Sequence, residues 1–256
     1  MVGRRADPPP RGEQRDDYQY RCPPDASPAH DALDVTRRRN ARPLWSDSPI
    51  GYPPPVRELL PGILTWRWFS EPHGYDFNGT LFLHEAGNLC VDPVPPSDEV
   101  LDRLEKEGVA HILITNRNHT RAANRVAEQT GAHVTIHPAD AAHAREQGTH
   151  IDAALEVGQR IGPFTVIGVP GKSPGEVALH DAARGILVVG DAVIGNPPGA
   201  LSLLPERVMD DPGQLRESVR ALMALEFEAL IVGDGVSILE GARERLGELV
   251  TGFTAR

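Results

Sequence analysis

Residues 111–121 read His-Ile-Leu-Ile-Thr-Asn-Arg-Asn-His-Thr-Arg, a short apolar run followed at once by a polar loop. The apolar residues 112–114 have the character of a buried strand. The six polar residues after Thr115 lead into an amphipathic pattern that indicates a helix. In folds of strands and helices, the loops that leave strand ends commonly carry the chemistry. This stretch therefore predicts functional side chains directly after a buried strand.

The same kind of strand recurs on both sides of this stretch. Further β-like runs cover residues 63–69, 79–85, 88–92, 133–137, 164–169, 176–181, 185–191 and 229–234. Helical patterns cover residues 97–108 with Ser97 as the expected N-cap, 119–130, 212–225 and 237–250, and His143 and His150 flank a short polar helix. Meandering strands in the first half and alternating strands and helices later predict an α/β (α+β) fold. We expect two mixed sheets packed face to face, with helices on the outside.

Composition divides the chain into two parts. Residues 1–43 hold nine arginines and seven acidic residues with few large apolar side chains, which predicts a mobile or surface-draped extension. Residues 44–256, the expected folded domain, carry a net charge of −12. An acidic body of this size repels phosphate backbones, which weighs against nucleic acid as the main partner. Aspartates also separate the arginine-rich segments, so the cluster at residues 37–39 is expected to be a solvated tail.

The remaining composition weighs against several other classes of protein. No apolar run approaches the roughly 20 residues of a membrane-spanning helix, and the N-terminus lacks the apolar stretch of a secretory signal. We therefore expect a cytoplasmic location and no membrane partner. Cys22 and Cys90 suggest no disulfide framework. Ten histidines invite a metalloenzyme interpretation, but those in or beside strands are expected to be structural or surface groups: His84, His111, His133 and His180.

Three later loops join the one after Thr115 as candidate sites. They cover residues 169–175, 189–192 and 232–235. Gly171-Lys172-Ser173 resembles the end of a phosphate-binding loop motif. That motif, however, needs a glycine at position 166, where this sequence has Val166. It also needs a helix directly afterwards, which Pro174 disfavours. The phosphate-loop interpretation therefore fails.

Taken together, the loops resemble those of the metallo-β-lactamase superfamily, in particular its branch of small hydrolases similar to glyoxalase II. The resemblance covers roughly residues 56–256. It is carried by Asn88 with Val91-Asp92-Pro93, the loop after Thr115, His137-Pro138-Ala139-Asp140, Pro170-Gly171-Lys172-Ser173-Pro174-Gly175, Gly190-Asp191-Ala192 and Gly233-Asp234-Gly235. It implies a four-layer αββα sandwich and, in ordinary members, hydrolysis by one or two metal ions held by histidines and aspartates.

The sequence departs from the family at most of these ligand positions. Asn116 and Asn118 replace the first two histidines, and Thr120 and Arg121 replace the next aspartate and histidine. Lys172 and Asp234 replace the histidines of the later loops, and only Asp191 keeps the family identity. His119 occupies a spacer position, so its side chain is expected to point away from the ligand cluster.

These substitutions predict a site without metal. Zinc needs about four imidazole, thiolate or carboxylate ligands, and asparagine, lysine and arginine do not supply them. Arg121 and Lys172 instead balance Asp191 and Asp234, so we expect an ion-pair network in place of the metal. The alternative is one weakly bound divalent cation, held by the oxygens of the two aspartates and of Asn116, Asn118 and Thr120.

Three functions stay open at this point. The leading one is a non-catalytic member that binds a small anionic ligand, facing Arg117, Arg121 and Lys172, or a protein partner. The alternative is an active hydrolase of thioesters, lactones or phosphoesters, with Asp191 as general base and Lys172 and Arg121 stabilising an oxyanion. Nucleic-acid binding through the arginine-rich tail ranks last. The sequence leaves homo-oligomerisation open.

Overall fold

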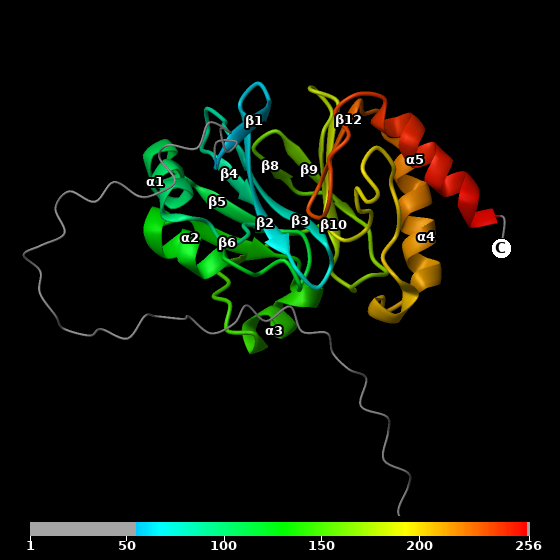
Figure 1. Ribbon diagram of the computed structural model, residues 1–256. Helices are drawn as coiled ribbons and strands as arrows, with labels where there is room; N and C mark the ends of the chain where they lie inside the picture. Colours follow the sequence, from blue (N-terminus) through cyan, green and yellow to red (C-terminus); the bar gives the residue numbers. More distant parts are fainter. Residues whose placement is uncertain (1–54, 255–256) are drawn as a thin grey trace, which may run out of the picture.

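The computed structural model describes residues 55–254 (Figure 1). The extension over residues 1–43, with Cys22 and the arginines at 37–39, lies outside the described residues, as does the expected domain boundary at residue 44. Expectations about them stay predictions. Within the described part, no helix has both the length and the apolar content needed to cross a bilayer.

Two mixed sheets form the centre of the molecule. The seven-stranded sheet has the order β1-β2-β3-β4-β5-β6-β7, with bounds Arg57–Leu60, Ile63–Ser70, Tyr75–Phe82, Leu89–Val91, His111–Ile114, His133–Ile136 and Ala153–Ala154. The five-stranded sheet has the order β12-β11-β10-β9-β8, with bounds, in that order, Ala229–Val232, Ile186–Val189, Val177–Asp181, Phe164–Gly168 and Arg160–Ile161. Neighbours β4, β5, β6 and β7 run parallel, as do β11 and β12, and all other pairs are antiparallel.

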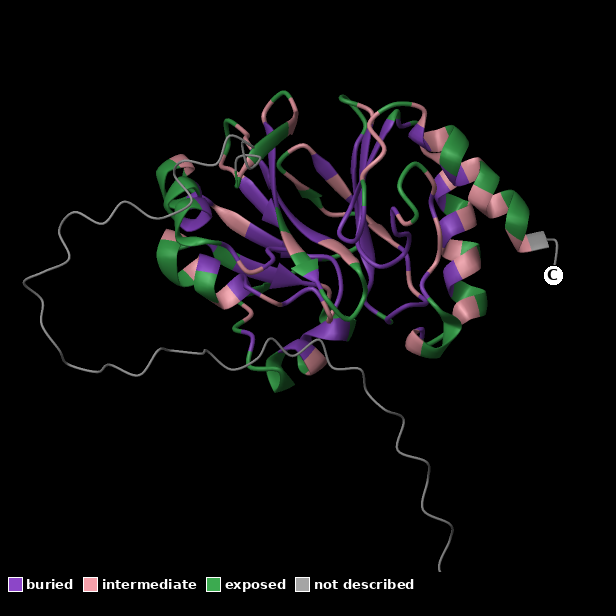
Figure 2. Cartoon of the chain, viewed as in Figure 1, coloured by how far each residue is buried: buried purple, intermediate pink, exposed green. Residues whose placement is uncertain are grey.

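Helices cover the outer face of each sheet (Figure 1). The helices on the seven-stranded sheet are α1 (Asp98–Glu107), α2 (Ala123–Thr130) and α3 (Pro138–Glu146), and those on the five-stranded sheet are α4 (Pro212–Ala221) and α5 (Ala242–Thr251). Short 3-10 helices cover Glu206–Val208, Leu222–Ala224 and Gly252–Thr254. Apolar side chains form one core under each helical layer and a third between the sheets, while exposed residues lie on the outward helix faces (Figure 2). The expected four-layer αββα sandwich is confirmed.

Local signals predicted most of these elements. All nine β-like runs coincide with strands, and α1 begins after the Ser97 cap, whose hydroxyl accepts from Val100 N, and ends at Gly108. The short strands β1, β7 and β8 were not expected. Cys90, in β4, is fully buried in the core.

Two helices begin later than their apolar periodicity indicates. Helix α2 begins at residue 123 instead of 119, because the intervening loop makes tertiary contacts, such as Ala122 N to Pro93 O at 3.1 Å. Helix α5 begins at 242 instead of 237. Ile238 pairs there with Leu230 at the edge of the five-stranded sheet, and their backbones exchange two hydrogen bonds. Tertiary pairing overrides the helical pattern at both places.

Candidate functional site

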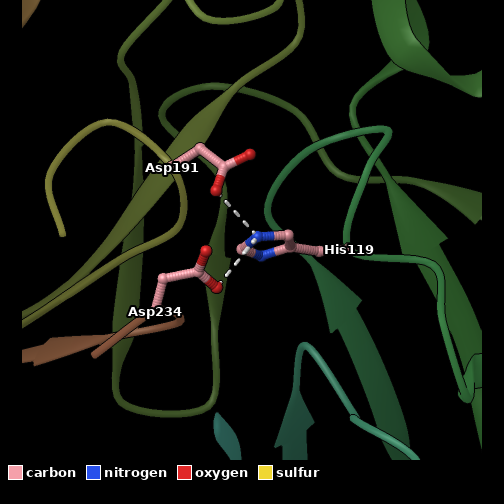
Figure 3. A group of neighbouring side chains, drawn as sticks. All are labelled: His119, Asp191 and Asp234. Carbon is pink, nitrogen blue, oxygen red and sulfur yellow. Dashed lines mark hydrogen bonds and ion pairs between the residues drawn. The ribbon is translucent and has the colours of Figure 1, made fainter. Parts of the chain in front are cut away.

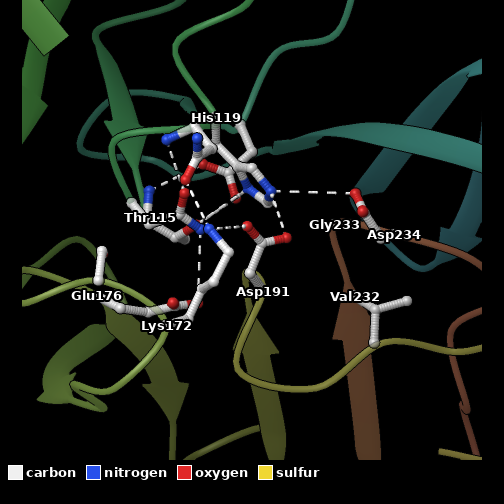
Figure 4. A network of polar contacts seen from close by, with 12 residues as sticks. Thr115, His119, Lys172, Glu176, Asp191, Val232, Gly233 and Asp234 are labelled. Atoms are coloured by element: carbon white, nitrogen blue, oxygen red, sulfur yellow. Dashed lines mark hydrogen bonds and ion pairs between the residues drawn. The ribbon is translucent and has the colours of Figure 1, made fainter. Parts of the chain in front are cut away.

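The predicted loops meet at one edge of the sandwich, between the two sheets (Figure 4). Five charged or titratable side chains converge there from five strand ends: Asp92 after β4, His119 after β5, Lys172 after β9, Asp191 after β11 and Asp234 after β12. Parallel strands bring their carboxyl ends to the same edge, which is why loops far apart in sequence become neighbours.

His119 lies at the centre of this cluster, and the expectation that it points away was wrong. Its Nδ1 lies 2.8 Å from Asp92 Oδ2 and 3.2 Å from Thr115 Oγ1. Its Nε2 lies 3.1 Å from Asp191 Oδ1 and 3.9 Å from Asp234 Oδ1 (Figure 3). The family spacing indicated a spacer position, but Asp92 fixes the loop differently by accepting hydrogen bonds from both Thr115 N and Thr115 Oγ1.

The glycines of the later loops make room for this arrangement. A Cβ at Gly233 would lie 2.7 Å from Cε1 of His119. A Cβ at Gly190 would overlap the hydroxyl of Thr115. The two glycines therefore permit the close approach of the sheets that brings the imidazole between the carboxylates.

The two ion pairs predicted from charge are present in the structure. Lys172 Nζ lies 3.2 Å from Asp191 Oδ2 and donates to Asn118 Oδ1 at 2.6 Å. Arg121 Nη2 lies 3.2 Å from Asp234 Oδ1. All the paired side chains are buried, since none is more than 4% exposed. The cationic groups therefore occupy the space between the strand ends and pair with the two aspartates.

His119 and Asp92 extend this network beyond the four charges expected. Burial and the nearby Arg121 lower the pKa of His119, but the carboxylates of Asp92 and Asp191 outweigh both and raise it to about 10. The imidazole is thus a cation at neutral pH. The buried set becomes three cations facing three carboxylates: His119, Lys172 and Arg121 against Asp92, Asp191 and Asp234.

The carboxyls of the network differ in their proton affinity. Burial raises the pKa of Asp191, but His119 and Lys172 outweigh it and hold this pKa well below its usual range. Burial raises the pKa of Asp234 to about 6, with Arg121 acting in the opposite direction and Asp191 adding to the rise. Glu176 was not singled out from the sequence, and burial followed by the Asp191 charge raises its pKa well above the usual value.

The other predicted positions lie beside the network or outside it. Asn116 is buried, with Nδ2 3.5 Å from Glu176 Oε1. Thr120 turns away and donates to Gln147 Oε1 at 3.0 Å, so the structure does not bring it to the site. Asn116 and Thr120 therefore face different parts of the fold, although they lie only four positions apart.

Arg117 does not face an open anion site. Its Nη2 donates to both carboxylate oxygens of Asp210 at 2.7 and 2.8 Å. Asp210 N in turn donates to Lys172 O at 3.3 Å. This pair links the loop after β5 to the segment that precedes α4, on the outer side of Lys172.

Asp140, from the His-Pro-Ala-Asp turn, holds two of the site loops in place. It is fully buried and accepts hydrogen bonds from Arg117 N at 2.9 Å, Ser173 Oγ at 2.5 Å and Gly175 N at 2.9 Å. Ser173 therefore points towards Asp140, away from the network that contains its neighbour Lys172. Asp140 was quoted for the family resemblance, but the spacing gave no sign of this role.

Asn78 is a site residue that the sequence did not reveal. Its Nδ2 donates to Val232 O at 3.1 Å and to Gly235 O at 2.9 Å. This buried amide ties β3 of one sheet to the loop after β12 of the other, and so fixes the position of Asp234. No clear signal in the sequence indicated it, because Asn78 lies in the mixed polar and apolar stretch at residues 76–80, just before the expected run at residues 79–85.

A metal ion fits this donor set poorly. His119, Asp191 and Asp234 each offer one ligand atom within 4.8 Å of the others. Zinc sites usually have about four donors or three and a water, and the imidazole ligand must be neutral. Here the imidazole holds its proton, and Lys172 and Arg121 each lie 3.2 Å from a carboxylate that would have to bind the ion.

A four-layer αββα sandwich with polar loops at one edge between its sheets is the architecture of the metallo-β-lactamase fold. The family model described as "Metallo-beta-lactamase superfamily" matches residues 58–253. The chain belongs to this superfamily, as its loops indicated.

Two curated relatives share one name. Hydroxyacylglutathione hydrolase of Cereibacter sphaeroides is 29% identical over 164 residues, covering 60% of each chain. The enzyme of the same name from Fuscovulum blasticum is 29% identical over 174 residues, covering 64% of each chain. The matched segments thus span less than two thirds of these relatives.

Solved structures agree with this assignment. TTHA1623, solved in a di-iron-bound form, superposes with a TM-score of 0.52 at 26% identity, covering 71% of this chain and 95% of that one. A β-lactamase domain protein from Burkholderia ambifaria superposes with a TM-score of 0.61 at 19% identity, covering 78% and 76%.

Proposed function

We propose that this protein is a member of the superfamily whose site loops hold no metal ion, and that it acts by binding and not by hydrolysis. The observation that carries the proposal is the buried network of three cations and three carboxylates at the position of the family's metal centre. The network balances its own charge, so it has no need of a metal ion to compensate the aspartates.

Electrostatics supports this proposal. Two unit charges about 4 Å apart interact by roughly 4 kcal/mol at an effective dielectric of 20, and a divalent ion doubles the repulsion from each cation. An ion bound by Asp191 and Asp234 would be repelled by both Lys172 and Arg121. It would also have to displace the proton of His119, whose pKa of about 10 opposes that loss at neutral pH.

The kind of partner follows from burial. Lys172 and Arg121 are almost fully buried and already paired, and Arg117 is paired with Asp210, so a small anion finds no free cation among these three. A protein partner that uses the outer surface is therefore favoured over a small anionic ligand in the network. We propose the same cytoplasmic location that the sequence indicated.

The second candidate is an active hydrolase of thioesters, lactones or phosphoesters. The hydroxyacylglutathione hydrolase relatives and the three donor atoms of His119, Asp191 and Asp234 favour it. In that case Asp191 is the general base, with Lys172 and Arg121 as oxyanion stabilisers. Substrate would first have to open a site whose groups are all buried.

Metal content and turnover separate the two candidates. Protein purified without chelator is analysed for zinc, iron and manganese, and assayed with generic thioester and phosphodiester substrates. We expect no transition metal whose binding depends on Asp191, and no turnover above that of Asp191→Asn. About one transition metal per chain that is lost in Asp191→Asn, or wild-type turnover that Asp191→Asn abolishes, overturns the proposal. The isosteric Asp191→Asn is chosen because Asp191→Ala would also leave a buried cavity.

A further inference from the structure

A pair of histidines lies at the opposite edge of the seven-stranded sheet. His111 begins β5 and His133 begins β6, and the two are direct register partners in this parallel pair. Their ring centres are 6.1 Å apart and their planes are inclined by 36°. The buried network follows the other ends of these strands, and four residues of strand span about 13 Å. The pair is therefore separate from the network.

The two rings lie at the margin of the gap between the sheets. His111 points to the same face as Leu113, because alternate residues of a strand share a face. Leu113 belongs to the core between the two sheets, whereas His111 is only half-buried and His133 is exposed. The Nδ1 atom of His111 is buried and has no hydrogen-bond partner within residues 55–254. The pair thus combines solvent access with an imidazole nitrogen whose bonding capacity is unused.

The environment of the two imidazoles favours binding a metal ion over protonation. Burial and the facing His133 both lower the pKa of His111, which favours the neutral form of this ring. Like charges directly opposite each other on neighbouring strands are destabilising. Neutral imidazole is the form that binds metal, and histidine is the commonest protein ligand of transition metals.

We infer that His111 and His133 together bind a divalent transition-metal ion of the zinc class. Zinc–nitrogen bonds are about 2.1 Å long, so two imidazoles on one ion have their centres roughly 5–6 Å apart. The observed 6.1 Å needs only a small adjustment of the side chains. The nearby Asp152 already accepts from Val134 N at 2.8 Å and lies 3.0 Å from His150 Nε2, so water completes the coordination.

Zinc titration of the full chain without an affinity tag tests this site. Imidazole nitrogen resonances are followed by NMR while binding is measured by calorimetry. We expect the rings of His111 and His133 to shift together. Loss of an outer-shell partner alone weakens a metal site about tenfold or more, so His111→Gln and His133→Gln should each weaken binding at least that much. His150→Gln, which removes another exposed histidine of the same region, should leave it unchanged.

Three outcomes would overturn the inference. One is the absence of a zinc-dependent shift at either ring in the wild type. Another is unchanged zinc affinity in His133→Gln, a surface substitution that does not endanger folding. The third is zinc binding that persists in both variants but disappears in Asp191→Asn. That last result would place the ion in the buried network and so would contradict the proposed function as well, whereas the first two leave it intact.

Discussion

His119→Gln removes the buried cation that lies between the carboxylates of Asp92 and Asp191. In the folded wild type the pKa of His119 is about 10, against 6.5 for an ordinary histidine. The folded state therefore keeps a proton that the unfolded chain releases above pH 6.5. The resulting stabilisation is complete below pH 6.5 and is lost as the pH rises towards 10.

The size of this pH dependence follows from the difference between the folded and unfolded pKa values of His119. The full slope is about 1.4 kcal/mol of unfolding free energy per pH unit, but it is only half of that at pH 6.5, where the unfolded histidine is half protonated. The wild type should therefore lose about 2.3 kcal/mol between pH 6.5 and 8.5. The window ends there because Cys90 and Tyr75, whose pKa values burial also raises, have ordinary values of 9.0 and 10.0 and begin to contribute at higher pH. His119→Gln should have a shallower slope than the wild type, because the histidine contribution is gone while buried Glu176, whose pKa is also raised, still contributes in the same direction. The variant should also be less stable at pH 6.5 by about 3–5 kcal/mol, because two carboxylates lose the cation between them.

Urea denaturation followed by tryptophan fluorescence measures both quantities, since Trp66 is buried in the core. His150→Gln is the matched control, because the side chain of His150 is 78% exposed and removing it should leave the slope in place. A wild-type free energy of unfolding that stays level from pH 6.5 to 8.5 would refute the reasoning, as would an equal slope in His119→Gln. If His119→Gln does not fold, a neutral imidazole in the NMR spectrum of the wild type at pH 8 gives the same refutation.

Three further predictions concern the surroundings of the network. Gly233→Ala should destabilise the protein by about 1–3 kcal/mol, because its methyl group overlaps His119, whereas Gly252→Ala, at a φ of −65° with no atom within 4 Å, should be close to neutral in the same urea assay. Asp140→Ala should cost about 3 kcal/mol or more, because it leaves three hydrogen-bond donors of the site loops without their acceptor, and equal denaturation midpoints for variant and wild type would contradict this role. A variant with the family's ligands restored should bind zinc at the site loops. Its substitutions are Asn116→His, Asn118→His, Thr120→Asp, Arg121→His, Lys172→His and Asp234→His. If this variant folds but binds no zinc by calorimetry, the ligand positions are misassigned.

The fold could be predicted from the sequence because its signals are local. Apolar runs marked the nine main strands, and Ser97 and Gly108 marked both ends of α1. The order of the loops indicated the superfamily. The short strands β7 and β8 have two residues each, too few for a periodic pattern to show.

The candidate site could be predicted only in part. An ion-pair network of Lys172 and Arg121 with the two aspartates followed from charge balance, but the individual pairs, Lys172 with Asp191 and Arg121 with Asp234, came from the structure. The position of His119 did not follow, because it depends on how one loop is held and not on its spacing.

The sequence by itself therefore determined the layers of the fold and the loops that form the site, and it predicted an ion-pair network among their charged side chains. Only the tertiary structure decided which groups pair and that His119 lies between the carboxylates. Asp92 adopts a positive φ of 47° after β4, binds Thr115 and turns the imidazole of His119 towards Asp191. The physical reason is that a buried charge takes its position from partners on other strands. Residues 111–121 thus contain the cation, His119, and its position depends on Asp92 and Asp191, which lie elsewhere in the sequence.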